Sequence, residues 1–307
     1  MTSQVRGRTT VTGRRGFGHR FLTGDGTALH VRATGPEDAA VTLVLAHAWT
    51  QDHTEWDPVL PLLPPQVRVL RYDHRGHGGS APARPGTATV AQLADDLAEL
   101  IAERVPSGRV VLAGHSMGGM TVMALAERHP ELVRLRVAGV ALIATSCSDM
   151  DRLTLGLPGV AGRVAARVDR ALARRLSRYA KEFVPVPAVA ARPVTKWLAF
   201  GRKARRADVR AMTAQVLRAH PSSAGGFRDS MSQHDRRAAL ATLRDTPAVI
   251  LAGDRDRITP LPHARVLAGE LPHAEFVLFP DAGHELTYER PVGVASRLRA
   301  LLDQAAD

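Results

Sequence analysis

Short apolar runs rich in Val, Ile and Leu alternate with amphipathic segments along most of the chain. Runs of this kind predict strands that are buried on both faces of a parallel sheet. An opening antiparallel hairpin is expected around the Asp25-Gly26 turn. Further strands are expected at 41–47, 67–73, 109–115, 137–145, 248–253 and 274–280, with helices at 56–63, 90–103 and 117–129. This alternation predicts an α/β fold with a mostly parallel sheet flanked by helices.

The alternation stops between residues 148 and 230. This stretch contains no convincing buried strand and holds five scattered prolines, so we expect a helical insertion there. Residues 1–16 lack a hydrophobic pattern and are expected to form a disordered arm. The chain therefore divides into the arm, a core domain built from 17–147 and 231–307, and the insertion at 148–230. With 307 residues and 45% hydrophobic content, one core plus an insertion is sufficient.

The insertion carries the excess positive charge of the chain. The whole chain has 41 basic and 30 acidic residues, a net charge of +11, and residues 148–230 alone have 17 basic residues against 6 acidic ones. Apolar residues recur there every three or four positions, at Val160, Val164, Val168, Leu172, Leu176, Tyr179 and Phe183. Basic residues fall between them, at Arg163, Arg167, Arg170, Arg174, Arg178 and Lys181. This spacing predicts a basic amphipathic helix.

Two interpretations of that helix remain open. In the first, its apolar face packs on the core and its arginines lie in water. In the second, the basic helix attracts an anionic membrane, a lipid or an acidic carrier protein. No nucleic acid is expected as a partner, because neither a recognition motif nor an aromatic stacking platform accompanies the charge.

Other features of the composition point to the cytoplasm and to chemistry without a cofactor. No apolar run reaches the roughly 18 residues of a membrane span, and the N-terminus lacks the apolar core of a signal peptide. The single cysteine, Cys147, excludes an intramolecular disulfide and suits a reducing compartment. The 13 histidines include no H-E-x-x-H pair, and the glycines at 76–79 lack the G-K-[S/T] of a phosphate loop. We predict neither a metal nor a cofactor.

One turn has the pattern of an activated serine. The apolar run at 110–113 leads into Gly114-His115-Ser116-Met117-Gly118 and then into a helical pattern. In a G-x-S-x-G turn between a strand and a helix, the glycines leave room for a sharp bend that exposes the serine Oγ. The alternative is a glycine-rich turn without chemistry. The strand before it and the helix after it favour Ser116 as a nucleophile.

A carboxylate and a histidine follow Ser116 along the chain. The strand expected at 248–253 runs into Asp254 and Asp256, and the last strand is followed by Gly283-His284. Each group thus follows the carboxyl end of a strand, which is the edge of a parallel sheet where ligands bind. The order Ser, Asp, His is that of the α/β-hydrolases and differs from both familiar serine protease orders. Either Asp254 or Asp256 can supply the carboxylate.

From about Phe21 to Leu302 the chain resembles the α/β-hydrolase superfamily, in the branch of serine esterases, lipases and haloperoxidase-like enzymes with a helical cap. Besides the serine turn, four segments carry this resemblance. They are the loop His47-Ala48-Trp49 with Trp56 downstream, Asp73 to Ser80 in the form D-x-R-G-x-G-x-S, Gly253 to Asp256 in the form G-x-x-D, and Gly283-His284 with Glu289 to Pro291. The usual family loop reads His-Gly where this chain has His47-Ala48, and a β-carbon there would narrow the site or shift the loop.

The resemblance implies a role for each residue of the site. Ser116 would attack a carbonyl, His284 would move the proton, and Asp256, at the G-x-x-D position, would orient the histidine. The backbone N–H groups of Met117 and Trp49 would form the oxyanion hole. The substrate pocket would take its walls from residues beside these groups, namely His47, Ala48, His115 and Leu286.

The expected function is hydrolysis of a small-molecule carboxylic ester, lactone or thioester through an acyl-enzyme on Ser116. A serine at the turn argues against the relatives that place an aspartate there, the haloalkane dehalogenases and epoxide hydrolases. A non-hydrolytic use of the same pocket, by a perhydrolase or a natural-product cyclase, is the first alternative. The second is a non-catalytic binding protein, which conflicts with the presence of Ser116, Asp256 and His284 together.

Overall fold

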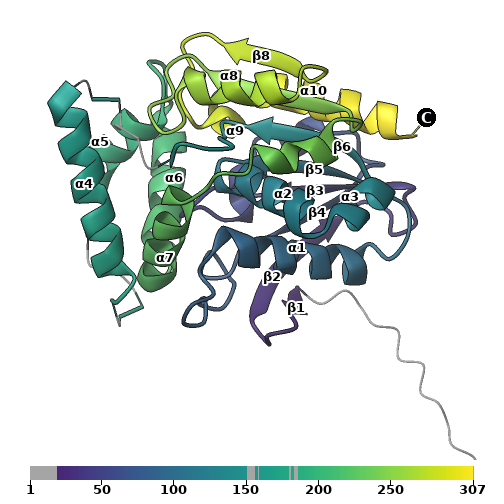
Figure 1. Cartoon of the computed structure of the whole chain (residues 1–307), viewed down its shortest axis with the longest axis horizontal. Coiled ribbons are helices and arrows are strands. Elements are labelled where there is room, and N and C mark those ends of the chain that lie inside the picture. Colours follow the sequence, from purple (N-terminus) through teal and green to yellow (C-terminus); the bar gives the residue numbers. More distant parts are fainter. Residues whose placement is uncertain (1–18, 151–155, 158, 180, 183–185, 307) are drawn as a thin grey trace, which may run out of the picture.

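A computed structural model describes residues 19–150, 156–157, 159–179, 181–182 and 186–306. Its strands are β1 Arg20–Leu22, β2 Ala28–Thr34, β3 Val41–Ala46, β4 Arg68–Tyr72, β5 Arg109–His115, β6 Val137–Ile143, β7 Ala248–Gly253 and β8 Glu275–Phe279. They form one eight-stranded sheet in the order β1-β2-β4-β3-β5-β6-β7-β8 (Figure 1). The β1–β2 and β2–β4 pairs are antiparallel, and all other pairs are parallel. The α/β prediction and the opening hairpin are confirmed, and the arm at 1–16 lies outside the described residues.

Helices cover both faces of the sheet. They are α1 Val90–Arg104, α2 Met117–Arg128, α3 Pro130–Arg136, α8 Leu261–Glu270, α9 Leu286–Glu289 and α10 Pro291–Ala306. Successive strand residues point to opposite faces, so Val44 packs with α1 and α2 while Leu43 and Leu45 pack with α10. Burial on both faces explains why the central strands are continuous apolar runs in the sequence.

The insertion between β6 and β7 is helical in its described part. Its helices are α4 Gly159–Leu176, α5 Ala188–Ala199, α6 Arg206–Arg218 and α7 Pro221–Ser232. They lie together at one end of the sheet (Figure 1). No helix among the described residues combines the length and the apolar character that a membrane span needs.

Two helix predictions differ from the structure. The helix expected at 56–63 is wrong: the chain there forms two short 3-10 turns, His53–Trp56 and Leu60–Leu62. Pro58 and Pro61 lack the N–H that a continuous α-helix would need. The helix α3, which starts at Pro130, was not expected, because it follows α2 after a single residue, His129.

The interpretation that places the apolar face of α4 on the core is wrong. The helix packs on α7 through its smallest residues, Gly162, Ala166 and Ala173, which are buried. A β-carbon on Gly225 of α7 would lie 2.6 Å from the Ala173 carbonyl oxygen, so the two backbones approach too closely for branched side chains. The periodic valines and Leu172 therefore face solvent together with the arginines. The helix ends at Leu176, and Phe183 lies outside the described residues.

A buried ion pair joins three segments beneath the sheet edge. The Arg75 guanidinium, fully buried in the loop after β4, donates two hydrogen bonds of 2.7 and 2.5 Å to the Asp96 carboxylate on α1. Its Nη1 also donates to Asp25 Oδ2 in the β1–β2 turn, at 2.8 Å. Removing one partner of such a pair leaves an uncompensated charge in the interior.

We predict that Arg75→Ala lowers the free energy of unfolding by about 3–5 kcal/mol, because Asp96 remains buried without its partner. Arg128→Ala is the matched control, since Arg128 also binds an aspartate on α1, Asp95, with two hydrogen bonds but is 42% exposed. That variant should lose at most about 1 kcal/mol. Urea unfolding of both variants measures the difference, and equal losses would contradict the role assigned to Arg75.

Candidate active site

Ser116 lies in a strained turn between β5 and α2. Its backbone has φ 53° and ψ −114°, in a region that residues with a β-carbon rarely adopt. The neighbouring glycines are required by contact: a β-carbon on Gly118 would lie 2.1 Å from the Ala46 carbonyl oxygen, and one on Gly114 would lie 2.4 Å from the Gly118 oxygen. This conformation is the one that the G-x-S-x-G pattern predicts.

His284 faces a buried carboxylate. Its Nδ1 lies 2.8 Å from Asp256 Oδ2, and both side chains are almost fully buried. The Asp256 carboxylate also accepts hydrogen bonds from the backbone N–H groups of Ile258 and Thr259 and from the Thr259 hydroxyl, each at 2.8 Å. Burial alone would raise the pKa of Asp256, but the charge of His284 and these hydrogen bonds hold it below its ordinary value. The carboxylate is therefore kept ionised beside the histidine.

The other candidate carboxylate points away. Asp254 is exposed, and Arg255 Nε lies 3.8 Å from its Oδ1. Of the two aspartates after β7, the structure brings only Asp256 to His284.

The loop that carries His284 is tied to the insertion. The His284 N–H donates to the Ala199 carbonyl oxygen at the end of α5, at 2.7 Å. The Glu289 carboxylate accepts from the N–H groups of Gly283, at 2.8 Å, and of Gly201, at 2.9 Å. The sequence places Glu289 in a motif but does not show what it binds, because its partner Gly201 lies 88 residues away along the chain. Glu289 thus clamps the histidine loop against the chain that follows α5.

Ser116 and His284 open onto the same cavity of about 180 Å³. Its walls are mostly apolar and come from the loop after β3 and from α5 and α6, including Val194, Leu198, Met212 and Val216. Within the described residues, no hydrogen bond joins Ser116 Oγ to His284. Such bonds are often long in a site without substrate.

The loop after β3 borders the cavity beside Ser116. The Ala48 N–H donates to Glu55 Oε2 at 3.0 Å, and the Trp49 indole N–H donates to the Ala224 carbonyl oxygen of α7 at 3.0 Å. Ala48 does not have a positive φ, so its methyl group fits without backbone strain, and it lines the cavity. Met117, the other predicted oxyanion donor, is the first residue of α2, where backbone N–H groups point outward unpaired.

Three of the predicted pocket residues lie behind the cavity wall. His47, His115 and Leu286 are fully buried and are not among the residues that line the cavity, unlike Ala48. His47 Nε2 accepts from the His74 N–H at 2.8 Å, which joins the loop after β3 to the loop after β4. Leu286 packs in the core beside α10.

A buried network of charged groups lies beneath the loops that carry Ala48, Ser116 and His284. His115 Nε2 donates to the His284 carbonyl oxygen at 3.0 Å, and its Nδ1 lies 3.4 Å from Glu55 Oε2. Burial disfavours a charged His115, but the nearby Glu55 carboxylate raises its pKa to about 9. Burial also raises the pKa of Glu55 to about 7. Gln51 Nε2 donates to Glu285 at 2.9 Å on the same side. No sequence motif identified Glu55, which nevertheless contacts the loops of Ala48 and Ser116.

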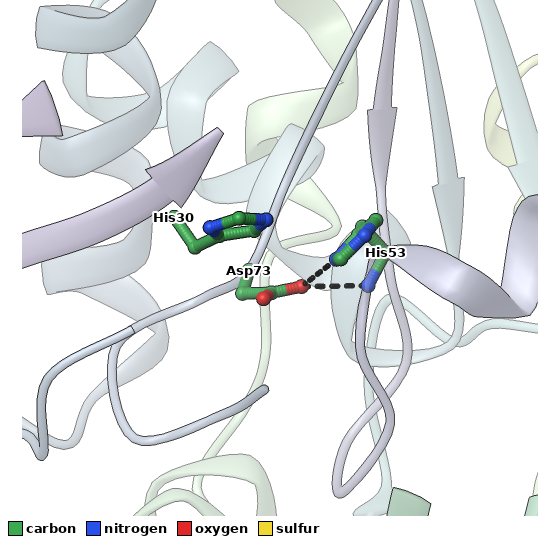
Figure 2. A group of neighbouring side chains, drawn as sticks. All are labelled: His30, His53 and Asp73. Atoms are coloured by element: carbon green, nitrogen blue, oxygen red, sulfur yellow. Dashed lines mark hydrogen bonds and ion pairs between the residues drawn. The ribbon is translucent and has the colours of Figure 1, made fainter. Parts of the chain in front are cut away.

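One cluster outside this site has residue types that bind metals. Figure 2 shows the Asp73 carboxylate next to His53 and His30. However, His53 Nδ1 lies 2.7 Å from Asp73 Oδ1, whereas two ligands of a tetrahedral zinc ion would be about 3.3 Å apart. The Asp73 oxygens also accept from the N–H groups of His53, at 2.7 Å, and Gly79, at 2.8 Å. This geometry is that of a hydrogen-bonded clamp between two loops.

Comparison with known proteins agrees with the fold and with the class of chemistry. Residues 41–291 match the family model described as the alpha/beta hydrolase fold. The pimeloyl-[acyl-carrier protein] methyl ester esterase of Aromatoleum aromaticum is 31% identical over 252 residues, which are 79% of this chain and 90% of that protein.

Solved structures agree as well. A thermophilic esterase from Thermogutta terrifontis superimposes with a TM-score of 0.73 and 26% identity, over 93% of this chain and 98% of the esterase. The enol-lactonase from Burkholderia xenovorans LB400 gives a TM-score of 0.71 and 26% identity, over 92% and 99% of the two chains.

The buried pair of Glu55 and His115 should make stability depend on pH. Both pKa values lie above their ordinary values of 4.5 and 6.5, so both groups bind protons more tightly in the folded protein. Their contribution is complete below those ordinary values and is lost as pH rises through about 7 for Glu55 and about 9 for His115. We predict that the free energy of unfolding of Glu55→Gln falls less steeply than that of wild type as pH rises from about 4.5 to about 9.

Urea unfolding at a series of pH values measures this slope. Glu131→Gln is the control, because the Glu131 side chain is 75% exposed and pairs only with Arg134 on its own helix. Parallel pH curves for wild type and Glu55→Gln would contradict the prediction.

Proposed function

Since this chain belongs to the alpha/beta hydrolase fold family and is an ester-cleaving enzyme, we propose that Ser116 attacks the ester carbonyl and carries the acyl group. One observation carries the proposal: the hydrogen-bonded pair of His284 and Asp256 opens onto the same cavity as the strained Ser116. The three side chains come from the ends of β5, β7 and β8. This is the edge of the sheet where the loops of such folds gather their catalytic groups.

The proton path follows from the hydrogen bonds. His284 Nδ1–H donates to Asp256 Oδ2, so the lone pair of Nε2 is left to accept the Ser116 hydroxyl proton. The proton then passes to the leaving oxygen, and the alcohol departs. A water molecule next attacks the acyl-enzyme and gives its proton to Nε2, which passes it to Ser116 Oγ as the ester bond breaks and the carboxylic acid leaves. Asp256, held ionised, stabilises the positively charged histidine in both halves of the reaction.

The negative charge on the tetrahedral intermediate needs donors at the cavity wall. We assign them to the backbone N–H groups of Met117 and Trp49. The Ala48 N–H is already used by Glu55, which leaves Trp49 as the next amide of that loop. The Met117 amide also lies at the positive end of α2.

The cavity supports a short acyl group. Its volume of about 180 Å³ is below the roughly 300–1,000 Å³ that is typical of sites for drug-sized ligands. The Ala48 methyl group and the apolar side chains of α5 and α6 supply the wall, so residues 148–230 act as a cap over the site. The relative from Aromatoleum is named as an esterase for the methyl ester of an acyl group on a carrier protein. By analogy, the leaving group here would be a small alcohol, and a carrier-bound acyl group would be one form of the substrate.

We predict that Ser116→Ala lowers the turnover of a short p-nitrophenyl ester by at least about 10³-fold, because the variant lacks the hydroxyl that is proposed to carry the acyl group. His284→Ala should cost as much, and the double variant should be hardly worse than either single one, since the groups act as a unit. A fluorophosphonate probe should label wild type and not Ser116→Ala. Retention of about a tenth of the activity by folded Ser116→Ala would exclude the acyl-enzyme.

The two aspartates after β7 provide a matched pair of variants. Asp256→Asn should lower turnover by about 10⁴-fold, because an amide at this position favours the wrong histidine tautomer. Asp254→Asn should leave turnover within a few-fold of wild type, since this side chain is exposed and far from the histidine contact. Steady-state kinetics on both variants decides the assignment, and the opposite ranking would transfer the role to Asp254.

A further inference from the structure

Helix α4 has an apolar stripe that no described residue covers. The side chains of Val160, Val164, Val168 and Leu172 are 66%, 50%, 61% and 59% exposed. Their spacing of four residues puts them on one side of the helix. Since α4 has 18 residues, the stripe runs along most of a helix about 27 Å long. Contiguous exposed apolar surface of this kind marks an interaction site.

This exposure is concentrated in one part of the chain. Among the large apolar side chains that are exposed in the described residues, eight lie between 160 and 197, and seven are scattered over all the rest. The inner side of α4 packs against α7. There Arg228 Nε also donates a 2.7 Å hydrogen bond to Asp169 of α4. Among the described residues, the stripe therefore lies on the side of α4 that faces away from its packing contact.

Arginines run alongside the stripe. Arg163 and Arg167 directly precede Val164 and Val168, and both are exposed. Arg174 follows on the same side of the helix and is 71% exposed, with Asp229 Oδ1 at 3.9 Å from its Nε. The insertion to which they belong carries a charge excess of +11, equal to the net charge of the whole chain. The stripe thus lies in the most positive part of the molecule.

We propose that the outer face of α4 binds the surface of an anionic lipid bilayer. The valines and Leu172 would enter the boundary between head groups and acyl chains, while the arginines bind lipid phosphate groups. A second copy of the chain fits poorly, because it would bring two rows of arginines together. The helix forms an outer edge of the molecule (Figure 1), and a planar surface can contact such a convex edge along its whole length. This inference does not depend on the proposed reaction.

Co-sedimentation with vesicles tests the proposal on the full chain. The vesicles contain either phosphatidylcholine alone or phosphatidylcholine with an equal amount of phosphatidylglycerol. Wild type should bind only the second kind, and more weakly at about 0.15 M salt than at low salt, because exposed charges are then screened over about 8 Å.

Two variants test the arginines and the apolar residues of the outer face of α4 separately, and a third variant controls for the change in net charge. Replacing Arg163, Arg167 and Arg174 by glutamine should weaken binding roughly 100-fold, at about fivefold for each arginine. Replacing Val164, Val168 and Leu172 by serine should weaken it at least about tenfold. The control replaces Arg134, Arg237 and Arg299 by glutamine, which removes the same charge from other exposed sites and should change binding less than about threefold.

All three variants change exposed side chains, so their thermal unfolding midpoints should match that of wild type, which excludes misfolding as the cause. Absence of binding to the anionic vesicles would overturn the proposal. Equal losses in the two arginine variants would also overturn it, because net charge alone would then explain binding. If the serine variant bound as well as wild type, or if the face bound an acidic carrier protein and no vesicle, the bilayer would be the wrong partner.

Discussion

The geometry of the candidate active site depends on how closely α2 approaches β3 at the Ser116 turn. The backbone contact between Gly118 and the Ala46 carbonyl oxygen leaves no space for a β-carbon, and a β-carbon on Gly119 would lie 2.6 Å from Thr145 Cγ2, just after β6. Thr145 Oγ1 in turn donates to the Ser116 carbonyl oxygen at 2.7 Å. The ends of three neighbouring strands are thus fixed against one another by one backbone contact and by the Thr145 side chain. The loop that supplies the proposed oxyanion donor starts from this fixed point.

Buried charge adds a second constraint to the same loops. Glu55 contacts both the Ala48 amide and His115, and His115 contacts the carbonyl of His284. If one of these loops moved alone, it would leave an ionised group in the interior without its partner, which is strongly unfavourable. The Ser116 turn, the loop after β3 and the histidine loop therefore hold their geometry as a unit. In the proposed reaction, donors held in this way would stabilise developing charge without rearranging.

Residues that act through local patterns could be predicted from the sequence, and those that act across the fold could not. The central strands, the Ser116 turn and the order of Asp256 and His284 follow from apolar runs and short motifs. Glu55 and Glu289 bind His115 and Gly201, which lie far away along the chain, so no local spacing indicates what these two carboxylates do. The prediction for helix α4 was wrong for another reason. The periodicity of the sequence shows which residues share a face of the helix, but it does not show which face packs against the rest of the protein. The buried face of α4 is the one that carries the small residues Gly162, Ala166 and Ala173, because these residues allow close packing of two helices.

The insertion has one surface that faces the cavity and another that faces outward. Helices α5 and α6 turn apolar residues toward the cavity, whereas α4 lies outside and reaches the rest of the protein mainly through α7. Within α7, Gly225 lies against α4, and the carbonyl of its neighbour Ala224 accepts the hydrogen bond of Trp49. Consecutive residues of α7 thus contact the inner side of α4 and the loop that borders the cavity, so this one helix helps to hold both surfaces in place.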